Sequence, residues 1–389
     1  MNRSTVPVTI RCFLSLFVAC ISLIVRAQDD LDLNKRIGKV DSAGIFFSPD
    51  QYSWCSSVIK GEDGKYHMLY SRWPHGKRLL DDDPMNYIFD GFRGWNKYSE
   101  IAHAVADRIE GPYRYVSTVL KGDGDKKRWD RFTMHNPQVR KFGNTYYLYY
   151  ISNDFDSTLY SDNKSFSGEW KHWLRYNATQ KIGVLKFRNF ADLVKGKYTR
   201  PAKPLMQPDS VHTFEVTTNP TVTQGPDGRY YIMYKSRKPN VGNMTFWMAV
   251  SSRPDGPFTL LSEVFTSAEM ACEDPCIWYD QQRKRFYAAA KYYSQSKLLA
   301  PQQGALVLIT SEDGVHWNAA THSLISLREF TFTNGKKINL AHLERPFVMT
   351  DAKGNVTGLF AAASIQEPAK TGTAIPFEQN TFIVYLPVH

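Results

Sequence analysis

The chain has 389 residues, a formal net charge of +10 and five cysteines, and 14% of its residues are aromatic. This length suits two ordinary domains or one large all-β domain. Only Cys55, Cys272 and Cys276 follow residue 27, and this odd number argues against a disulfide framework and predicts buried free thiols. No CxxC pair or histidine cluster has the spacing of metal ligands, so neither a metal nor a cofactor is expected.

Residues 1–27 have the pattern of a secretory signal peptide. Two arginines precede an apolar run over residues 12–25, and Val25-Arg26-Ala27 places small residues where a signal peptidase cuts. We expect a secreted or periplasmic mature chain that begins at Gln28 and carries a charge of about +7. The run is short for a stable membrane span, so an N-terminal anchor is the alternative, and lipid attachment at Cys20 is a second one.

The charge of the exported chain has two interpretations. Exported basic proteins often meet acidic glycans, whereas the same charge also suits a merely solvated surface. A basic balance alone is weak evidence for nucleic-acid binding, and export argues against it, so no nucleic-acid partner is expected.

Residues 28–44 are polar and are predicted to form an extended arm, and residues 45–389 contain five repeats of one unit. Each unit pairs two strands rich in Tyr, Phe and Val across a turn of Gly, Asn or Asp, the residues that tight hairpins require. The five strand pairs lie at 54–59 and 65–70, 135–139 and 145–150, 218–222 and 229–234, 271–279 and 286–291, and 344–348 and 356–360. Third strands are predicted at 101–106, 182–185, 246–250, 305–309 and 381–386.

The size of these units indicates how they assemble. Equivalent apolar residues at 58, 139, 222, 277 and 348 are separated by 81, 83, 55 and 71 positions. A small antiparallel sheet cannot bury both of its faces alone and must stack on its neighbours. Five such sheets predict an all-β, five-bladed β-propeller. A β-sandwich is the alternative, but it does not explain why the same strand opening recurs five times.

In a propeller the first strand of each blade lines the axis, so the five strand openings should converge at one mouth. The residues at these openings are Cys55 and Ser56, Asn136, Asn219, Glu273 and Asp274, and Glu344 and Arg345. Glu273, Asp274 and Glu344 are the carboxylates among them, and hydrolysis of a glycosidic bond needs two carboxyl groups, one of them protonated. We therefore expect these three residues to be catalytic, with the pKa of Glu273 raised by its neighbours; alternatively, Asp274 only bonds backbone amides.

From about residue 45 to the end, the chain resembles the five-bladed glycoside hydrolases of family 43 and its relatives, families 32, 62, 117 and 130. The resemblance rests on the strand openings with Pro, the Asp-Gly hairpins and the motif Glu273-Asp274-Pro275. It implies that Glu273 is the general acid and that Asn219 occupies the place of an Asp that tunes this acid. The family's first-blade Asp, its general base, falls at Cys55. A thiol cannot replace a carboxylate base, so the base must come from Glu344, Asp50 or Asp274, or hydrolysis has been lost.

Cations and aromatic residues complete the candidate site. Arg72, Lys235 and Lys291 occupy the ends of second strands, and Arg345 stands at the fifth opening. Together with His135, they predict binding of a carboxylated or sulfated sugar, unless they only neutralise the three carboxylates. The predicted substrate-binding residues are therefore Arg72, His135, Asn136, Asn219, Lys235, Lys291, Arg345 and Trp54, with Trp54 able to stack on a sugar face.

Two functions of different classes follow from this pattern. The first is a secreted, exo-acting glycoside hydrolase whose substrate is an anionic poly- or oligosaccharide. The second is a non-catalytic carbohydrate-binding propeller that kept the pocket and lost the base. Release of sugar from neutral, uronic and sulfated glycans would distinguish them.

Overall fold

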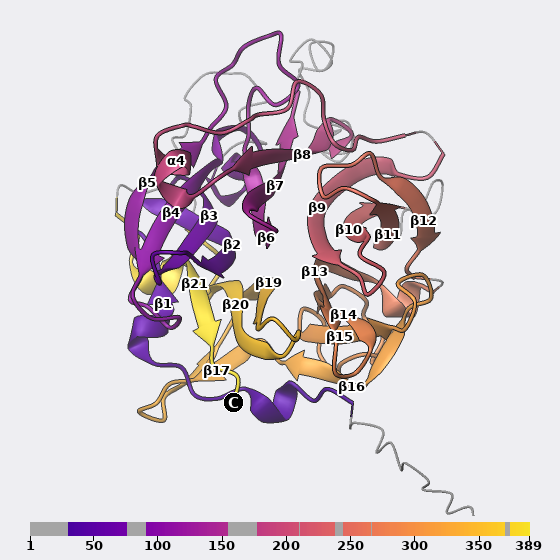
Figure 1. Cartoon of the computed structure of the whole chain (residues 1–389). Helices are drawn as coiled ribbons and strands as arrows, with labels where there is room; N and C mark the ends of the chain where they lie inside the picture. The colour runs from indigo at the N-terminus through magenta and orange to yellow at the C-terminus, as the bar shows by residue number, and fades with distance from the viewer. Residues whose placement is uncertain are drawn as a thin grey trace, which may run out of the picture.

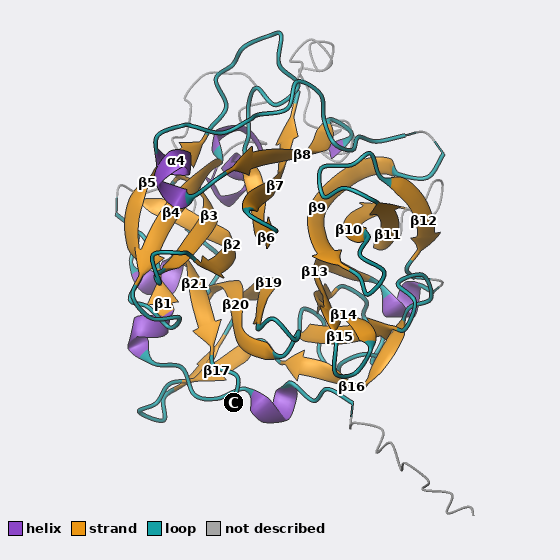
Figure 2. Ribbon diagram, viewed as in Figure 1, coloured by secondary structure: helices purple, strands orange, loops and turns teal. Residues whose placement is uncertain are grey.

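The computed structural model describes residues 30–75, 91–154, 177–209, 211–237, 244–265, 267–369 and 374–389. The predicted signal peptide, including Cys20, lies outside these residues. The described chain forms sheets arranged as blades around a central axis (Figure 1), and strands make up most of it (Figure 2). The prediction of an all-β, five-bladed propeller is confirmed.

Each blade is an antiparallel sheet whose strands follow one another in the chain, apart from the last strand of the fifth blade. Blade one contains β2 (Gln51–Lys60), β3 (Tyr66–Pro74), β4 (Glu100–Ala106) and β5 (Arg114–Leu120). Blade two contains β6 (His135–Phe142), β7 (Thr145–Asn153) and β8 (Gln180–Phe187). Blade three contains β9 (Phe214–Gln224), β10 (Tyr230–Arg237), β11 (Met244–Ser251) and β12 (Thr259–Glu263).

The fourth and fifth blades complete the ring. Blade four contains β13 (Cys272–Asp280), β14 (Arg285–Tyr292), β15 (Leu306–Ser311) and β16 (Asn318–Ser326). Blade five contains β19 (His342–Thr350), β20 (Val356–Ser364), β21 (Thr381–Leu386) and β1 (Ile45–Phe46). A separate hairpin of β17 (Glu329–Thr331) and β18 (Lys337–Asn339) links these two blades.

Helices are short and lie in the connections. The α-helices are α2 (Trp95–Tyr98) and α4 (Phe190–Val194). The 3-10 turns are η1 (Asn34–Arg36), η2 (Ser42–Gly44), η3 (Gly91–Gly94), η6 (Ala268–Met270) and η7 (Phe377–Gln379). None of the helices in the described ranges is long or apolar enough to cross a membrane.

The two ends of the chain close the propeller in one sheet. Strand β1 pairs with β21, with Phe46 opposite Ile383, so an N-terminal strand becomes the outermost strand of the fifth blade. The sequence pattern did not reveal this strand. The preceding segment also differs from the expected polar arm, because Leu31, Leu33 and Val40 are buried against the blades.

The core lies between neighbouring blades, which explains why several strands are apolar on both faces. All residues of β15 and β21 are buried, since each blade is covered on both sides. The alanines of residues 288–290 and 361–363 are also fully buried, and such small side chains let sheets approach closely. The three cysteines predicted to be buried free thiols, Cys55, Cys272 and Cys276, are buried and form no disulfide in the described chain.

Every inner strand is irregular at the same place. Its pairing register shifts there, and one residue adopts a left-handed backbone with φ between 52° and 62°. These residues, called the axial ring below, are Cys55, Asn136, Asn219, Asp274 and Arg345. Such a bulge redirects a side chain. We predicted that these residues open the inner strands. The strands begin one to five residues earlier, so the residues lie at bulges inside the strands.

Hydrogen bonds also link neighbouring inner strands. In four of the blades, the side chain two positions after the ring residue accepts a hydrogen bond from a backbone N–H of the following blade. The four pairs are Ser57 with Val139 (2.6 Å), Gln138 with Val222 (2.6 Å), Thr221 with Ile277 (2.9 Å) and Cys276 with Val348 (3.3 Å). These bonds satisfy buried N–H groups and fix how the inner strands lie around the axis.

Candidate active site

The five residues of the axial ring line a cavity of about 310 Å³, which we name the axial pocket. Each of the five inner strands contributes two adjacent residues to it: Trp54 and Cys55, His135 and Asn136, Thr218 and Asn219, Glu273 and Asp274, and Glu344 and Arg345. Lys235 and Arg237 of β10 also line it. The predicted convergence of the strand openings is thus observed, because equivalent positions of the repeated blades meet at one end of the axis.

Glu273 is held by two ammonium groups. Lys235 Nζ lies 2.9 Å from its Oε2, and Lys291 Nζ lies 2.8 Å from its Oε1. Burial alone would raise the pKa of Glu273, but the two lysines lower it far below the ordinary value. The expectation that neighbouring carboxylates raise this pKa is therefore wrong: cations stand closer to Glu273 than sequence spacing indicated.

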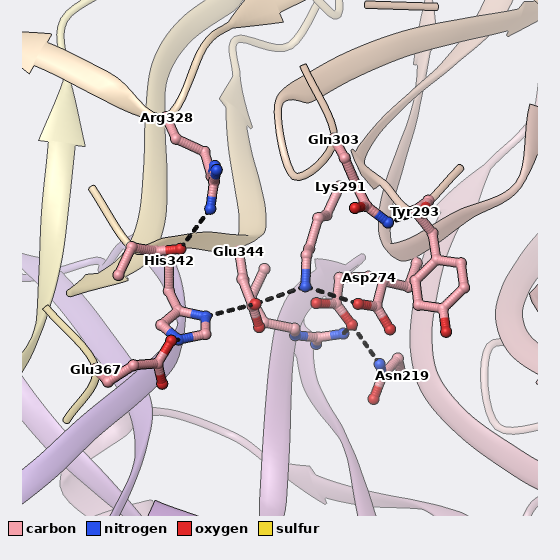
Figure 3. Close-up of polar contacts among 12 residues, drawn as sticks. Asn219, Asp274, Lys291, Tyr293, Gln303, Arg328, His342, Glu344 and Glu367 are labelled. Carbon is pink, nitrogen blue, oxygen red and sulfur yellow. Dashed lines mark hydrogen bonds and ion pairs between the residues drawn. The ribbon is translucent and has the colours of Figure 1, made fainter. Parts of the chain in front are cut away.

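Glu344 shares one of these cations. Its Oε1 lies 2.5 Å from Lys291 Nζ and 3.2 Å from His342 Nδ1, and His342 Nε2 lies 3.0 Å from Glu367 Oε1 (Figure 3). Burial raises the pKa of Glu344, but Lys291 and His342 bring it below the ordinary value. Burial in turn lowers the pKa of His342, while its bond to Glu344 and its contact with Glu367 raise it overall.

Asp274 is the carboxyl group of the axial ring. It accepts a hydrogen bond from Asn219, which itself accepts one from Asn136 (Figure 3 shows the first of these). Burial, reinforced by the charge of Glu273, raises the pKa of Asp274 despite nearby cations. The axial pocket therefore holds two carboxyl groups whose pKa is lowered, Glu273 and Glu344, beside one whose pKa is raised, Asp274.

Cys55 and His135 do not form a reactive thiolate pair. The Cys55 sulfur lies 3.9 Å from His135 Nε2, and burial raises the thiol pKa well above its usual range. Burial and the charge of Arg345 hold the pKa of His135 well below its usual range, and the ring stacks on Trp95 at 4.5 Å. Both side chains are therefore neutral groups of the pocket.

Of the four cations predicted at the pocket, Arg72 is the one whose position differs from the prediction. Lys235 pairs across the sheet with Thr218, and Lys291 pairs with Glu273, so both side chains reach the pocket. In blade one, the residue at the position equivalent to these two lysines is Ser71, which pairs across the sheet with Trp54. Arg72 is one residue further along and points to the other face of the sheet.

The contacts of Arg72 agree with that orientation. Its Nε lies 2.7 Å from Glu100 Oε1, and Nη2 bonds Thr118 and Tyr115 within the same blade. The prediction that Arg72 stands at the pocket mouth is wrong. The predicted residues Trp54, His135, Asn136, Asn219, Lys235, Glu273, Asp274, Glu344 and Arg345 line the pocket, and Lys291 reaches two of them.

Aromatic side chains form part of the pocket wall. Trp54 lines it but is only 4% exposed, whereas Tyr293 lines it with 41% of its surface exposed. Phe92 and Trp95, from the aromatic-rich segment before β4, also contribute. Arg237 and Tyr293 were not predicted. Each lies two residues beyond a predicted lysine, and the period of two in a strand would have placed both on the same face.

Within the described ranges, no group of three His, Cys, Asp or Glu side chains is placed to hold a metal ion. The carboxylates of the pocket instead bond lysine and histidine. Carboxyl, ammonium and imidazole groups in such contacts can transfer protons and stabilise charge.

No protein-family model matches the sequence, and no curated protein does. Solved structures do match the fold. A family 117 glycoside hydrolase from the marine bacterium Zobellia galactanivorans aligns with a TM-score of 0.55 at 14% identity, over 90% of this chain and 89% of that one. An endo-arabinase from Bacteroides thetaiotaomicron aligns with 0.51 at 11% identity, over 90% and 98%.

A third match is a family 43 β-xylosidase/α-arabinofuranosidase from a compost metagenome. It aligns with a TM-score of 0.51 at 12% identity, over 90% of this chain and 94% of that one. These identities are too low to carry an activity across, but the alignments span nearly the whole of each chain. The five-bladed β-propeller of this protein is thus a fold that it shares with glycoside hydrolases of families 117 and 43.

Proposed function

We propose that this protein is a glycoside hydrolase that acts, after export, on an anionic poly- or oligosaccharide bound in the axial pocket. The observation that carries the proposal is the presence of three carboxyl groups from two neighbouring blades in one pocket. Cations lower the pKa of two of them, Glu273 and Glu344, against the effect of burial, while burial raises the pKa of Asp274. Glycoside hydrolysis needs this combination of an acid and a carboxylate.

The residues suggest a division of roles. Asp274 supplies the proton to the leaving oxygen, and Glu344 acts as base or nucleophile. Glu273 orients the two lysines, and its negative charge adds to the effect of burial in raising the pKa of Asp274. Lys235 and Lys291 contact the carboxylates of the pocket at 2.5 to 2.9 Å, and Arg345, which lines the pocket with unbonded donors, is the cation that supports an anionic substrate.

One observation favours a second function, a carbohydrate-binding propeller without catalysis. The ring position in the first blade carries the neutral thiol of Cys55, where the resemblance to family 43 implies a carboxylate base. In that case the pocket would bind a saccharide and leave it intact.

The test is incubation of the mature chain with neutral, uronic and sulfated oligosaccharides, followed by analysis of the released sugars. We expect release from an anionic substrate, with a salt dependence of binding, and no release by a double variant Asp274→Asn, Glu344→Gln. Binding without release by the wild type would support the second function. Neither binding nor release across the three classes would overturn both.

A further inference from the structure

The axial ring is bonded on one side and interrupted on the other. Side-chain hydrogen bonds run from Asn136 to Asn219 and from Asn219 to Asp274. Cys55 and Arg345 occupy the remaining positions, so on this side the ring residue that interacts with the guanidinium is a thiol and not an amide.

Arg345 lacks acceptors at this interruption. Its side chain is 9% exposed and lines the pocket, and neither Nε nor Nη1 has a hydrogen-bond partner. Nη1 lies 3.6 Å from Asp274 Oδ1, too far for a strong hydrogen bond. Buried donors without partners are costly, particularly on a charged group.

The backbone adds to that cost. Arg345 has φ of 53°, a left-handed conformation that Asn and Asp tolerate but arginine seldom adopts. Strained, incompletely bonded residues of this kind concentrate at ligand sites.

The carboxylates of the pocket lie closer to the two lysines than to Arg345. Lys235 and Lys291 are matched by Glu273 and Glu344 at 2.5 to 2.9 Å. Asp274 Oδ1 lies farther from Arg345, at 3.6 Å from Nη1, and burial keeps Cys55 a neutral thiol. A carboxylate from outside would bring acceptors to Nε and Nη1, which have no hydrogen-bond partner.

We propose that Arg345 binds the carboxylate of a uronic acid unit in the axial pocket. The proposal rests on the proposed function for the position of the sugar, and it names uronates as the substrate class. A planar guanidinium pairs with a planar carboxylate through two parallel hydrogen bonds. Such a pair would satisfy donors that the protein itself leaves without acceptors.

The first test is calorimetric titration of the mature chain at low salt with D-galacturonate and D-glucuronate, beside D-galactose, D-glucose and inorganic sulfate. We expect at least one uronate to bind about 10- to 100-fold more tightly than its neutral counterpart, the range of a charged hydrogen-bonded pair. Arg345→Met should abolish this difference. Arg72→Gln, which changes a cation outside the pocket, should preserve it. Equal affinity for uronate and neutral sugar in the wild type would overturn the proposal, and so would preference for sulfate alone.

Cys55→Asp is the sharper variant and does not depend on whether Arg345→Met folds. Its carboxylate would lie beside Arg345 and compete with the uronate, so uronate affinity should fall about 10-fold or more while neutral sugars bind as before. Cys55→Ser, which is similar in size and uncharged, should keep the discrimination. Unchanged or tighter uronate binding by Cys55→Asp would overturn the proposal.

These binding measurements separate the two proposals. Uronate binding without release of sugar from any glycan would retain the Arg345 subsite and remove the hydrolase function. Hydrolysis of neutral glycans without uronate binding would retain the function and remove the subsite.

Discussion

Glu273 and Glu344, from the inner strands of neighbouring blades, accept hydrogen bonds from one and the same ammonium group. Lys291 Nζ lies 2.8 Å from Glu273 Oε1 and 2.5 Å from Glu344 Oε1. One buried cation therefore holds together two carboxylates that would otherwise repel each other. The pKa of both carboxyl groups is lowered as a result, although burial alone would raise it.

This arrangement predicts how stability depends on pH. A carboxyl group whose pKa is lower in the folded chain stabilises it above the unfolded pKa and loses that contribution as the pH falls. Lys291→Met should therefore cost up to about 3–5 kcal/mol of unfolding free energy at pH 7, the range for removing one partner of a buried pair. The difference from wild type should shrink as the pH falls below about 4.5. Chemical denaturation at several pH values measures it.

The control for this variant is Lys141→Met, which removes a cation paired with Glu62 at the surface and should change stability little. A Lys291→Met deficit of constant size from pH 7 to pH 3 would show that the loss comes from packing and not from the shared charge.

The second prediction concerns the proton donor. Asp274→Asn keeps the shape, the left-handed backbone and the bond from Asn219 but removes the transferable proton, so turnover of a natural glycan should fall roughly 10²- to 10⁴-fold. An aryl glycoside with a good leaving group needs less protonation and should lose less. Glu273→Gln, which only disturbs the lysines, should lower both rates alike. The reverse pattern would return the acid role to Glu273, as the resemblance to family 43 implies.

The third prediction tests the bonds that link the inner strands. Thr221→Val is nearly isosteric but removes the acceptor of the buried Ile277 N–H and of Gln138 Nε2, so we expect a loss of about 1–3 kcal/mol in unfolding free energy. Thr217→Val is a matched control on the same strand, because the Thr217 hydroxyl is buried without a partner and its removal should be neutral or stabilising. Equal losses in both variants would mean that the two hydrogen bonds to the Thr221 hydroxyl contribute nothing to stability.

The recurrence of the strand pattern was enough to predict the fold and the meeting of the inner strands. Apolar pairs of strands, with a Pro in the inner strand of four of the five, repeat at a spacing that a ring of sheets accommodates. The two-residue strand β1 carries no comparable signal, since its place is set by pairing with β21 at the other end of the chain. Long-range pairing of so short a strand is invisible to local pattern.

The candidate site was predicted less well where the orientation of a side chain depends on a one-residue shift in strand register, or where a pKa depends on one contact between strands. Arg72 is one position from the residue that faces the pocket, and that single step turns its side chain to Glu100. The protonation of Glu273 was misjudged because Asp274 is adjacent in sequence, while the lysines that dominate come from β10 and β14. Sequence neighbours are apparent on inspection; partners across strands and blades are not.

The last prediction concerns the pairing of His342 with Glu344. The imidazolium form of His342 bonds Glu344 at 3.2 Å and helps to keep that carboxylate ionised, and the pKa of His342 is itself raised. If Glu344 acts as base or nucleophile, it must be ionised for turnover. His342→Asn removes a charged partner, so the pKa of Glu344 should rise and the acid limb of kcat/KM should move up by about one pH unit. Glu367→Gln is the control: it is 82% exposed and touches only the other nitrogen of His342, so its effect should be much smaller. A full pH–rate profile of the three proteins on one substrate decides the matter, and an acid limb that stays in place in His342→Asn would mean that Glu344 does not carry the ionisation that limits catalysis.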